Sequence, residues 1–294
     1  MPTPLSQLGE NAILQRLLQH LPANEHLLVG PGDDCAVVRG DAEWDILLKT
    51  DVVVESVHFT PDTEPERIGR KALARAVSDI AAMGGIPEHA LVTLLVHRER
   101  PVELPEGIYR GMRALAELYG ISLAGGETSA LPFDGLVINV ALTGRVERGR
   151  AVLRSGARPG DLLCVSGKLG GSFPSGRHLD FEPRVTLSRY LMERGLVPSA
   201  MMDLSDGLAT DLPRLVEASC CGFEMEQNLL PLHEGCSIQQ ALSDGEDYEL
   251  LMTFAPEIYN SLNQAALPVP VTCIGKIVPQ NRENLGCGWQ HFSA

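Results

Sequence analysis

The sequence predicts an α+β protein made of two domains. Its 294 residues are enough for two domains of ordinary size. Hydrophobic residues make up 44% of the chain and charged residues 21%, which is typical of a globular protein with a core. Patterns of helices and strands alternate along the chain, and a basic, glycine-rich segment near residues 145–160 separates two halves that both contain strands. We therefore expect one domain at residues 1–149 and another at residues 150–294.

In the first half, hydrophobic periodicity predicts three helices. The leucines of residues 6–20 have helical spacing. The clearest helix begins at a capping box of Thr63 and Glu66 and ends at Gly84-Gly85. Its buried stripe consists of Ile68, Leu73, Val77 and Ile80. The remaining predicted elements are a strand over 52–54, a strand over 90–96, a helix over 105–119, and strands over 121–124 and 136–142.

The second half has the pattern of an α/β domain. Asp206 is expected to cap a helix that runs to about residue 219. The other predicted elements are a strand over 161–165, a helix over 184–195, and strands over 222–226, 248–254 and 270–276.

Charge and composition exclude several classes of protein. The chain has 24 basic and 38 acidic residues, so its formal net charge of −14 argues against a nucleic-acid-coating surface. No stretch is long and apolar enough for a membrane span, and the N-terminus lacks a secretory signal pattern. The seven cysteines are an odd number without a CxxC pair, which is typical of reduced thiols. We expect a cytoplasmic protein that binds neither nucleic acid nor membranes.

Six short segments combine acidic residues with glycine or small polar residues. These are GPGDD (30–34), KTD (49–51), SD (78–79), GGETS (125–129), DLSDG (203–207) and DGEDYE (244–249). Mg²⁺ prefers such hard oxygen ligands and usually completes its coordination with water and substrate phosphates. Any one segment alone is typical of a turn or a helix cap.

Two of these acids are less easily explained as turn residues. Asp51 lies in an almost entirely apolar strand pattern, and Asp79 lies in an apolar helix. A carboxylate in such a place must be paired or metal-bound, because a bare buried charge is very costly. Arg75, one turn before Asp79, leaves a plain ion pair open as an alternative.

Motifs of other enzyme classes are absent from the sequence. The segment after Ser166 resembles a phosphate loop but lacks the GxxxxGK[ST] spacing, and no GxGxxG opens a helix. HExxH and GxSxG are absent too, so a zinc hydrolase or a serine esterase has little support.

In their order and approximate spacing, the acidic segments resemble the thiamine-monophosphate kinase family of the aminoimidazole-ribonucleotide-synthetase-like superfamily. The resemblance covers nearly the whole chain and includes LRSGARPGDLL (153–163) and the terminal GWQHF (288–292). It implies a two-domain fold whose N-terminal domain forms a shared β-barrel in a homodimer. It also implies a C-terminal α/β domain over a cleft that holds ATP and several Mg²⁺ ions.

The resemblance also implies roles for individual residues. The metal positions it implies are Asp34, Thr50, Asp51, Asp79, Glu127, Asp203 and Asp206. The ATP contacts it implies are Thr50, Gly126, Glu127, Arg154 and Ser205. Thiamine monophosphate would contact His58, Glu246 and Trp289, and an aromatic face at Trp289 suits a cationic thiazolium ring.

The implied reaction needs no general base, because the acceptor is a phosphate oxygen that is already ionised at neutral pH. Catalysis would then consist of alignment and charge neutralisation around Asp51, Arg154 and Asp206 during in-line attack on the γ-phosphorus of ATP. No covalent phosphoenzyme is needed.

The sequence departs from the family pattern in a few places. Glu127 stands where the family usually has Asp, Ser129 and the residues after it lack the usual Arg, the stretch between Gly171 and Pro183 is short, and Lys49 adds a cation beside the metal positions. Two alternatives therefore stay open. One is a related ATP-dependent enzyme acting on another phosphorylated or carboxylated metabolite, and the other is a non-catalytic nucleotide-binding relative.

Overall fold

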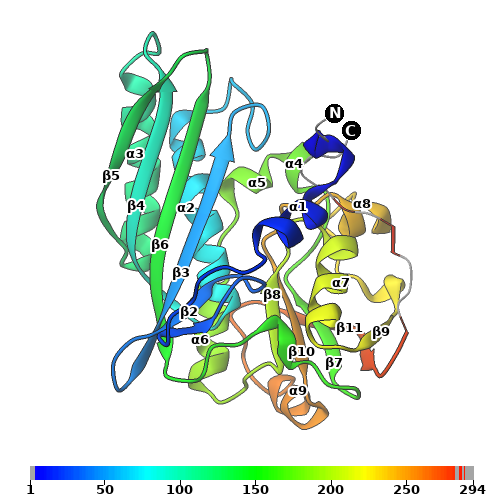
Figure 1. Ribbon diagram of the computed structural model, residues 1–294. Helices are drawn as coiled ribbons and strands as arrows, with labels where there is room; N and C mark the ends of the chain where they lie inside the picture. Colours follow the sequence, from blue (N-terminus) through cyan, green and yellow to red (C-terminus); the bar gives the residue numbers. More distant parts are fainter. Residues whose placement is uncertain (1–3, 282–284, 287, 289–294) are drawn as a thin grey trace.

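Two β-sheets, one in each half of the chain, organise the molecule (Figure 1). The computed structural model describes residues 4–281, 285, 286 and 288. The first sheet has the strand order β1-β2-β3-β6-β4-β5, in which only the β4–β5 pair is parallel. Its strands are β1 (Leu27–Val29), β2 (Ala36–Arg39), β3 (Trp44–Val54), β4 (Ile86–His97), β5 (Ser122–Leu131) and β6 (Leu136–Glu147).

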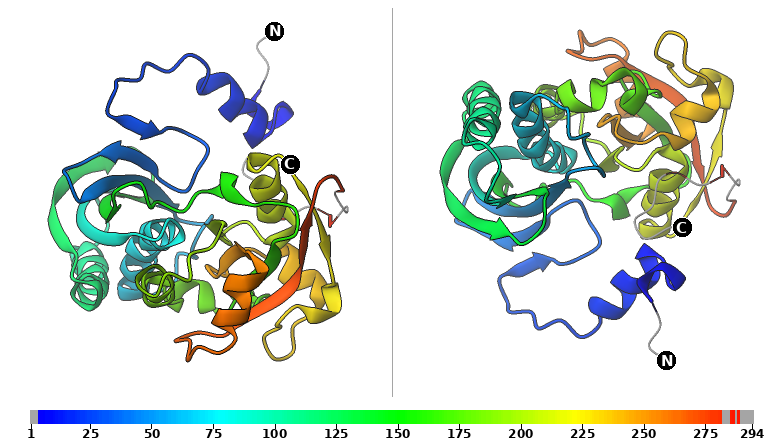
Figure 2. Two further views of the ribbon diagram at one scale, coloured as in Figure 1. Left: turned by 90° about the horizontal axis from the view of Figure 1, so that it is seen from below. Right: turned by 90° about the horizontal axis from the view of Figure 1, so that it is seen from above.

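Two long helices cover one face of this sheet, which is strongly curved (Figure 2). They are α2 (Pro65–Ala82) and α3 (Glu103–Tyr119). Residues of β6 alternate between buried and partly exposed, as expected for a strand with one covered face. The predicted stripe of α2 is confirmed, because Ile68, Leu73, Val77 and Ile80 are all at most 2% exposed. Within the described part of one chain the sheet is open and does not close into a barrel.

The second sheet is antiparallel, with the order β8-β10-β7-β11-β9 and helices on both faces. Its strands are β7 (Leu162–Ser166), β8 (Ala200–Asp203), β9 (Gly222–Met225), β10 (Leu250–Phe254) and β11 (Val271–Val278). One face packs on α7 (Leu208–Ala218) and α8 (Ile238–Ser243), and the other packs on α6 (Val185–Glu193) and α9 (Pro256–Leu262). This α/β arrangement agrees with the prediction for the second half.

Helix α2 connects the two halves and thereby positions the site. Its C-terminal residue Ala82 belongs to the core around α6 and β10. The Ser188 hydroxyl donates a hydrogen bond of 2.6 Å to the carbonyl of Ala81. Residues near the end of α2 therefore meet the second sheet directly.

Three details of the predicted elements are wrong. Helix α2 has no capping box, since Glu64 is its N-cap and the Thr63 hydroxyl accepts from the amide of Thr60. Asp206 does not cap α7, whose N-cap is Gly207. The N-terminal helix is short, α1 (Glu10–Leu17), and its leucine stripe is exposed, with Leu17 at 66%.

The GGETS segment also differs from its predicted place at the end of a strand. It lies inside β5, which continues to Leu131.

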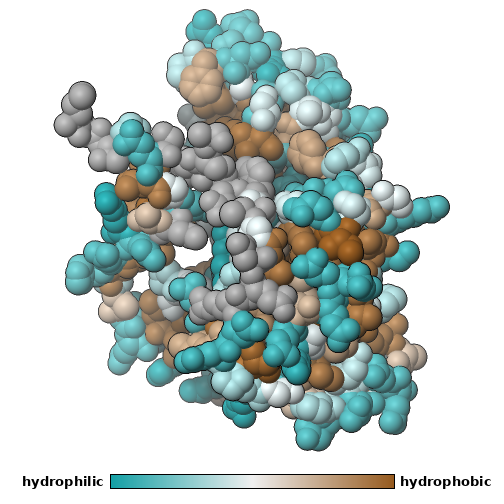
Figure 3. Space-filling view, turned by 90° about the vertical axis from the view of Figure 1, so that its right-hand side faces the viewer, coloured by the Kyte–Doolittle hydropathy of each residue, from teal (hydrophilic) through white to brown (hydrophobic). Residues whose placement is uncertain are grey.

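The side of the molecule in Figure 3 mixes hydrophilic and hydrophobic residues over the second domain. Among the described residues, no helix combines the length and the apolar character that crossing a bilayer requires.

Candidate active site

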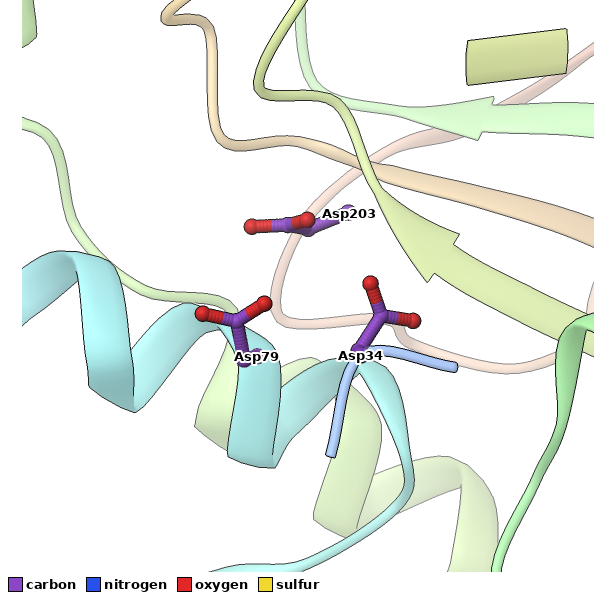
Figure 4. A group of neighbouring side chains, drawn as sticks. All are labelled: Asp34, Asp79 and Asp203. Atoms are coloured by element: carbon purple, nitrogen blue, oxygen red, sulfur yellow. The ribbon is translucent and has the colours of Figure 1, made fainter. Parts of the chain in front are cut away.

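Three buried aspartates from distant parts of the chain converge where the two halves meet (Figure 4). Asp34 lies just before β2, Asp79 lies on α2, and Asp203 ends β8. One oxygen from each carboxylate lies within 4.8 Å of the others. All three residues are at most 7% exposed. Such a concentration of negative charge away from water requires nearby cations.

The protein supplies part of this positive charge itself. The Lys49 ammonium lies 2.8 Å from Asp79, and the Arg154 guanidinium lies 2.5 Å from Asp34. Ser78 donates a 2.7 Å hydrogen bond to Asp203.

The pKa values of Asp79 and Asp203 in this cluster are raised. Burial raises the pKa of Asp79, and burial followed by the charge of Asp34 raises the pKa of Asp203 to about 7. A divalent cation would offset the repulsion that remains, and carboxylates converging at this spacing fit a Mg²⁺ ion.

A cavity of about 260 Å³ opens beside the cluster. It brings together four residues that the sequence analysis assigned to substrate, ATP or metal: His58, Ser205, Asp206 and Glu246. The other residues of its lining are Val57, Arg75, Phe173, Asp244 and Tyr248. The cavity is therefore built by the segment that follows β3, by α2, and by the short helix α4 (Ser172–Ser175) and loops of the second domain.

Glu246 is held ionised in the wall of this cavity. The wholly buried Lys71 forms an ion pair with it, and His178 lies 3.3 Å from the same carboxylate. Burial alone would raise the pKa of Glu246, but the hydrogen bond from His178 and the charges of Lys71 and Arg75 lower it to about 2. A fixed negative charge in a partly apolar cavity suits a cationic ligand.

Asp51 and Asp206 are each paired with an arginine. Arg75 lies 3.1 Å from Asp51, and Arg214 lies 2.5 Å from Asp206. The alternative in which Arg75 pairs with Asp79 is not what the structure contains, because Asp79 is paired with Lys49. Both acids lie near the cluster, yet neither belongs to the group of converging oxygens.

Thr50 points away from the cluster. Successive residues of a strand face opposite sides, so Lys49 and Asp51 face α2 while Thr50 lies on the uncovered face. There its hydroxyl donates a 2.9 Å hydrogen bond to Asn139 of β6.

Gly126 and Glu127 lie at the far edge of the first sheet. The register places Asp51, Val140, Val92 and Gly126 in one row across β3, β6, β4 and β5. With adjacent strands about 4.8 Å apart, Asp51 and Gly126 are separated by roughly 14 Å. A Cβ atom at Gly126 would meet the carbonyl oxygen of Val92 at 1.8 Å, so strand packing alone already requires glycine there.

Trp289 lies outside the described residues. The residue before it, Gly288, is described, and its amide donates a 2.9 Å hydrogen bond to the Thr210 hydroxyl on α7. A Cβ atom at Gly288 would meet the carbonyl oxygen of Asp206 at 2.2 Å. The chain thus passes close to the Asp206 segment immediately before the predicted aromatic residue.

Sequence reasoning missed several groups around the cavity. Lys71, His178 and Phe173 form a connected group in which the Phe173 and His178 rings stack at 4.2 Å. Tyr248 stacks on Phe181 at 3.9 Å and lines the cavity. Of these residues, only Lys71 could have been noticed in the sequence. It lies between apolar positions of a predicted helix, and a lysine that is buried there needs a charged or polar partner.

Comparison with known proteins identifies the class to which this fold belongs. Residues 32–146 match the family model described as AIR synthase related protein, N-terminal domain. Thiamine-monophosphate kinase of Bacillus subtilis is 36% identical over 91% of this chain and 89% of its own length. The enzyme of that name from Rhodopirellula baltica is 38% identical over 91% and 88%. A solved structure of AaThiL complexed with AMPPCP and TMP is 30% identical, covers 99% of both chains and has a TM-score of 0.86.

The chain is thus an α+β protein of the AIR-synthase-related class with an acidic cluster between its two halves. At this identity and coverage, it belongs to the thiamine-monophosphate kinase family.

Proposed function

We propose that this protein transfers the γ-phosphate of ATP to thiamine monophosphate and forms thiamine diphosphate and ADP. The observation that carries the proposal is the buried Asp34–Asp79–Asp203 cluster directly beside the cavity of His58 and Glu246. Relatives bearing the kinase name and the AaThiL complex with AMPPCP and TMP support it. A cluster for a metal-bound polyphosphate next to a cavity for an organic cation matches the two substrates of this reaction.

In the proposed reaction, an oxygen of the thiamine-monophosphate phosphate attacks the γ-phosphorus of ATP in line. A new P–O bond forms, and the bond between the γ-phosphorus and the β,γ-bridging oxygen breaks, so that ADP leaves with that electron pair. The attacking oxygen is ionised at neutral pH, so the chain supplies no general base. The role of the chain is to align the two anions and to offset their charges. Arg154, whose guanidinium lies 2.5 Å from Asp34, supplies positive charge at the cluster for this purpose.

Asp34, Asp79 and Asp203 are the residues that would hold Mg²⁺, with Asp51 and Asp206 as candidate further ligands next to them. When bound, Mg²⁺ supplies charge neutralisation at the phosphate oxygens. Lys49 already neutralises part of Asp79 and Arg154 part of Asp34, so two cations of this chain are paired with the acidic cluster.

The remaining assigned residues suggest a homodimer. β2 pairs only with Asp45–Leu48 of β3, and among the described residues no strand covers that edge of β3 beyond Leu48. β5 forms the other open edge of the sheet. Open edges invite pairing with another chain. A second copy whose β5 lay along Lys49–Val54 would bring its Gly126 and Glu127 to the Asp51 region, where Thr50 faces the same uncovered side. Such pairing would close the shared barrel.

A coupled assay of the purified protein with ATP, Mg²⁺ and thiamine monophosphate tests the proposal. We expect stoichiometric thiamine diphosphate and ADP, with no product when EDTA removes the metal. Clear binding of ATP without any thiamine diphosphate would contradict the proposal. That result would favour a related enzyme with another acceptor.

A further inference from the structure

One buried cation in the cavity wall has an unused hydrogen-bond donor. Among the described residues, four buried side-chain polar atoms have no hydrogen-bond partner: Asp45 Oδ1, Arg75 Nη1, Arg145 Nε and Arg189 Nε. Of these four residues, only Arg75 lines the cavity beside the aspartate cluster. A buried donor without a partner is costly, which makes its position informative.

The geometry of Arg75 leaves one corner of its guanidinium without a hydrogen bond. Its Nε and Nη2 atoms face the two oxygens of Asp51 at 3.2 Å and 3.1 Å, so this edge is fully used. The remaining nitrogen, Nη1, lies 3.8 Å from Glu246 Oε1, which is too far for a hydrogen bond. The side chain is 13% exposed and is held in place by Asp51. Arg75 is thus a fixed cation with a donor left over.

The cavity wall carries both signs of charge. Glu246, Asp244 and Asp206 contribute carboxylates, whereas Arg75 contributes a guanidinium. Thiamine monophosphate carries a thiazolium cation and a phosphate anion. Carboxylates alone would attract the first group and repel the second. A guanidinium that presents N–H groups in a fixed plane is well suited to phosphate oxygens.

We propose that Arg75 binds the phosphate group of the acceptor and fixes its position for attack. This inference rests on the proposed function and adds a residue that determines specificity for a phosphorylated acceptor. Arg75 Nη1 donates to a non-attacking phosphate oxygen, while Asp51 holds the guanidinium in its orientation. The unphosphorylated form of the same ligand makes no use of this group.

The test compares two ligands that differ only in the phosphate. Binding of thiamine monophosphate and of thiamine is measured by calorimetry on the full chain with Mg²⁺ and AMPPCP. Arg75→Lys keeps a charge near Asp51 but loses the planar fork. We expect it to weaken thiamine monophosphate binding by about 10- to 100-fold, the range for a hydrogen bond to a charged group. Thiamine binding should change by less than about 2-fold, because no phosphate contact is lost.

Arg100→Lys is a matched control. Arg100 also binds acidic partners through Nε and Nη2, at 2.6 Å to Asp134 and 2.9 Å to Glu55, but it does not line the cavity. This variant should bind both ligands as the unmodified protein does. Arg75→Gln, checked for folding by circular dichroism, should reproduce the selective loss for thiamine monophosphate.

Two results would overturn the assignment of Arg75. Equal weakening of both ligands would show that Arg75 only shapes the cavity and supports Asp51. Unchanged affinity for thiamine monophosphate in both Arg75 variants would show that its phosphate lies elsewhere. Failure of the unmodified protein to bind thiamine monophosphate at all would instead refute the proposed function, and the role of Arg75 with it.

Discussion

The aspartate cluster and the Gly126–Glu127 segment come from the same kind of sequence pattern, yet the fold treats them differently. Asp34, Asp79 and Asp203 are drawn from three elements into one buried group. Glu127 lies exposed on an edge strand.

The two regions differ in how much of a binding site one chain provides. Where α2 packs against the second sheet, the three carboxylates lie close together. Ion pairs from Lys49 to Asp79 and from Arg154 to Asp34 stabilise them there. At the edge of the first sheet, Glu127 is exposed, and among the described residues β5 pairs with β4 only. One region is therefore a buried acidic cluster within one chain. The other would become part of a site only through the proposed pairing with a second copy.

Asp203→Asn should have the largest effect on the cluster. Loss of one metal ligand from a group of three removes several kcal/mol of charge stabilisation, so we expect turnover to fall by at least about 100-fold. The rise in melting temperature on adding Mg²⁺ should also disappear. Steady-state kinetics and thermal melting would measure both effects. Asp134→Asn, at an exposed ion pair with Arg100, is the control and should leave both unchanged.

Glu127→Ala should affect turnover less and leave the cluster intact. We expect a loss of about 10-fold, because a site shared between chains keeps its buried ligands when one edge contact is lost. Most of the Mg²⁺-induced rise in melting temperature should remain. Glu99→Ala, another exposed glutamate, serves as the comparison. If Glu127→Ala abolished the Mg²⁺ effect as Asp203→Asn does, the separation of the two regions would be wrong.

The pH dependence of Mg²⁺ binding should show the smallest effect. The pKa of Asp203 is raised from 3.8 to about 7, chiefly by burial, so the folded chain holds this proton more tightly than the unfolded chain. Without metal, this contribution to stability is complete below pH 3.8 and is lost as the pH rises through about 7.

Mg²⁺ needs the ionised carboxylates, so its stabilising effect should change in the opposite direction and grow between pH 6 and pH 8. Melting temperatures with and without Mg²⁺ at a series of pH values measure this trend. A Mg²⁺ effect that shrank as the pH rose would contradict the assignment of the cluster as its site. In Asp203→Asn the trend should be absent.

Much of the architecture could be predicted from local patterns. The stripe of α2, the helix that ends at Gly120 and most strands of the two sheets follow from periodicity and end signals that the tertiary structure does not override. The short strands β1, β2 and β8 are not predicted, because three or four residues are too few to show a period. The sequence predicts a strand only over 121–124 of β5, because the glycines that follow weaken a strand signal. Here Gly126 is needed for close approach to Val92, a reason that only the pairing of β4 and β5 reveals.

The candidate site was predictable as a set of residues but not as an arrangement. The order of the acidic segments pointed to Asp34, Asp79 and Asp203, which the fold brings together. The cavity network was not visible, since Lys71 and Glu246 are 175 positions apart and no local rule joins them. The partner of Arg75 was likewise decided by β3 packing on α2 and not by helical spacing.

The most direct test combines a chain altered in the aspartate cluster and a chain altered at Glu127 in one dimer. Asp203→Asn and Glu127→Ala chains, carrying different tags, are co-expressed, and the mixed dimers are purified and assayed for thiamine diphosphate. If Glu127 completes the site of the opposite chain, one of the two sites in a mixed dimer combines an intact cluster with an intact Glu127. We predict turnover near half that of the unmodified dimer, well above either variant alone. Mixed dimers no more active than the average of the two variant homodimers would contradict a site shared between chains.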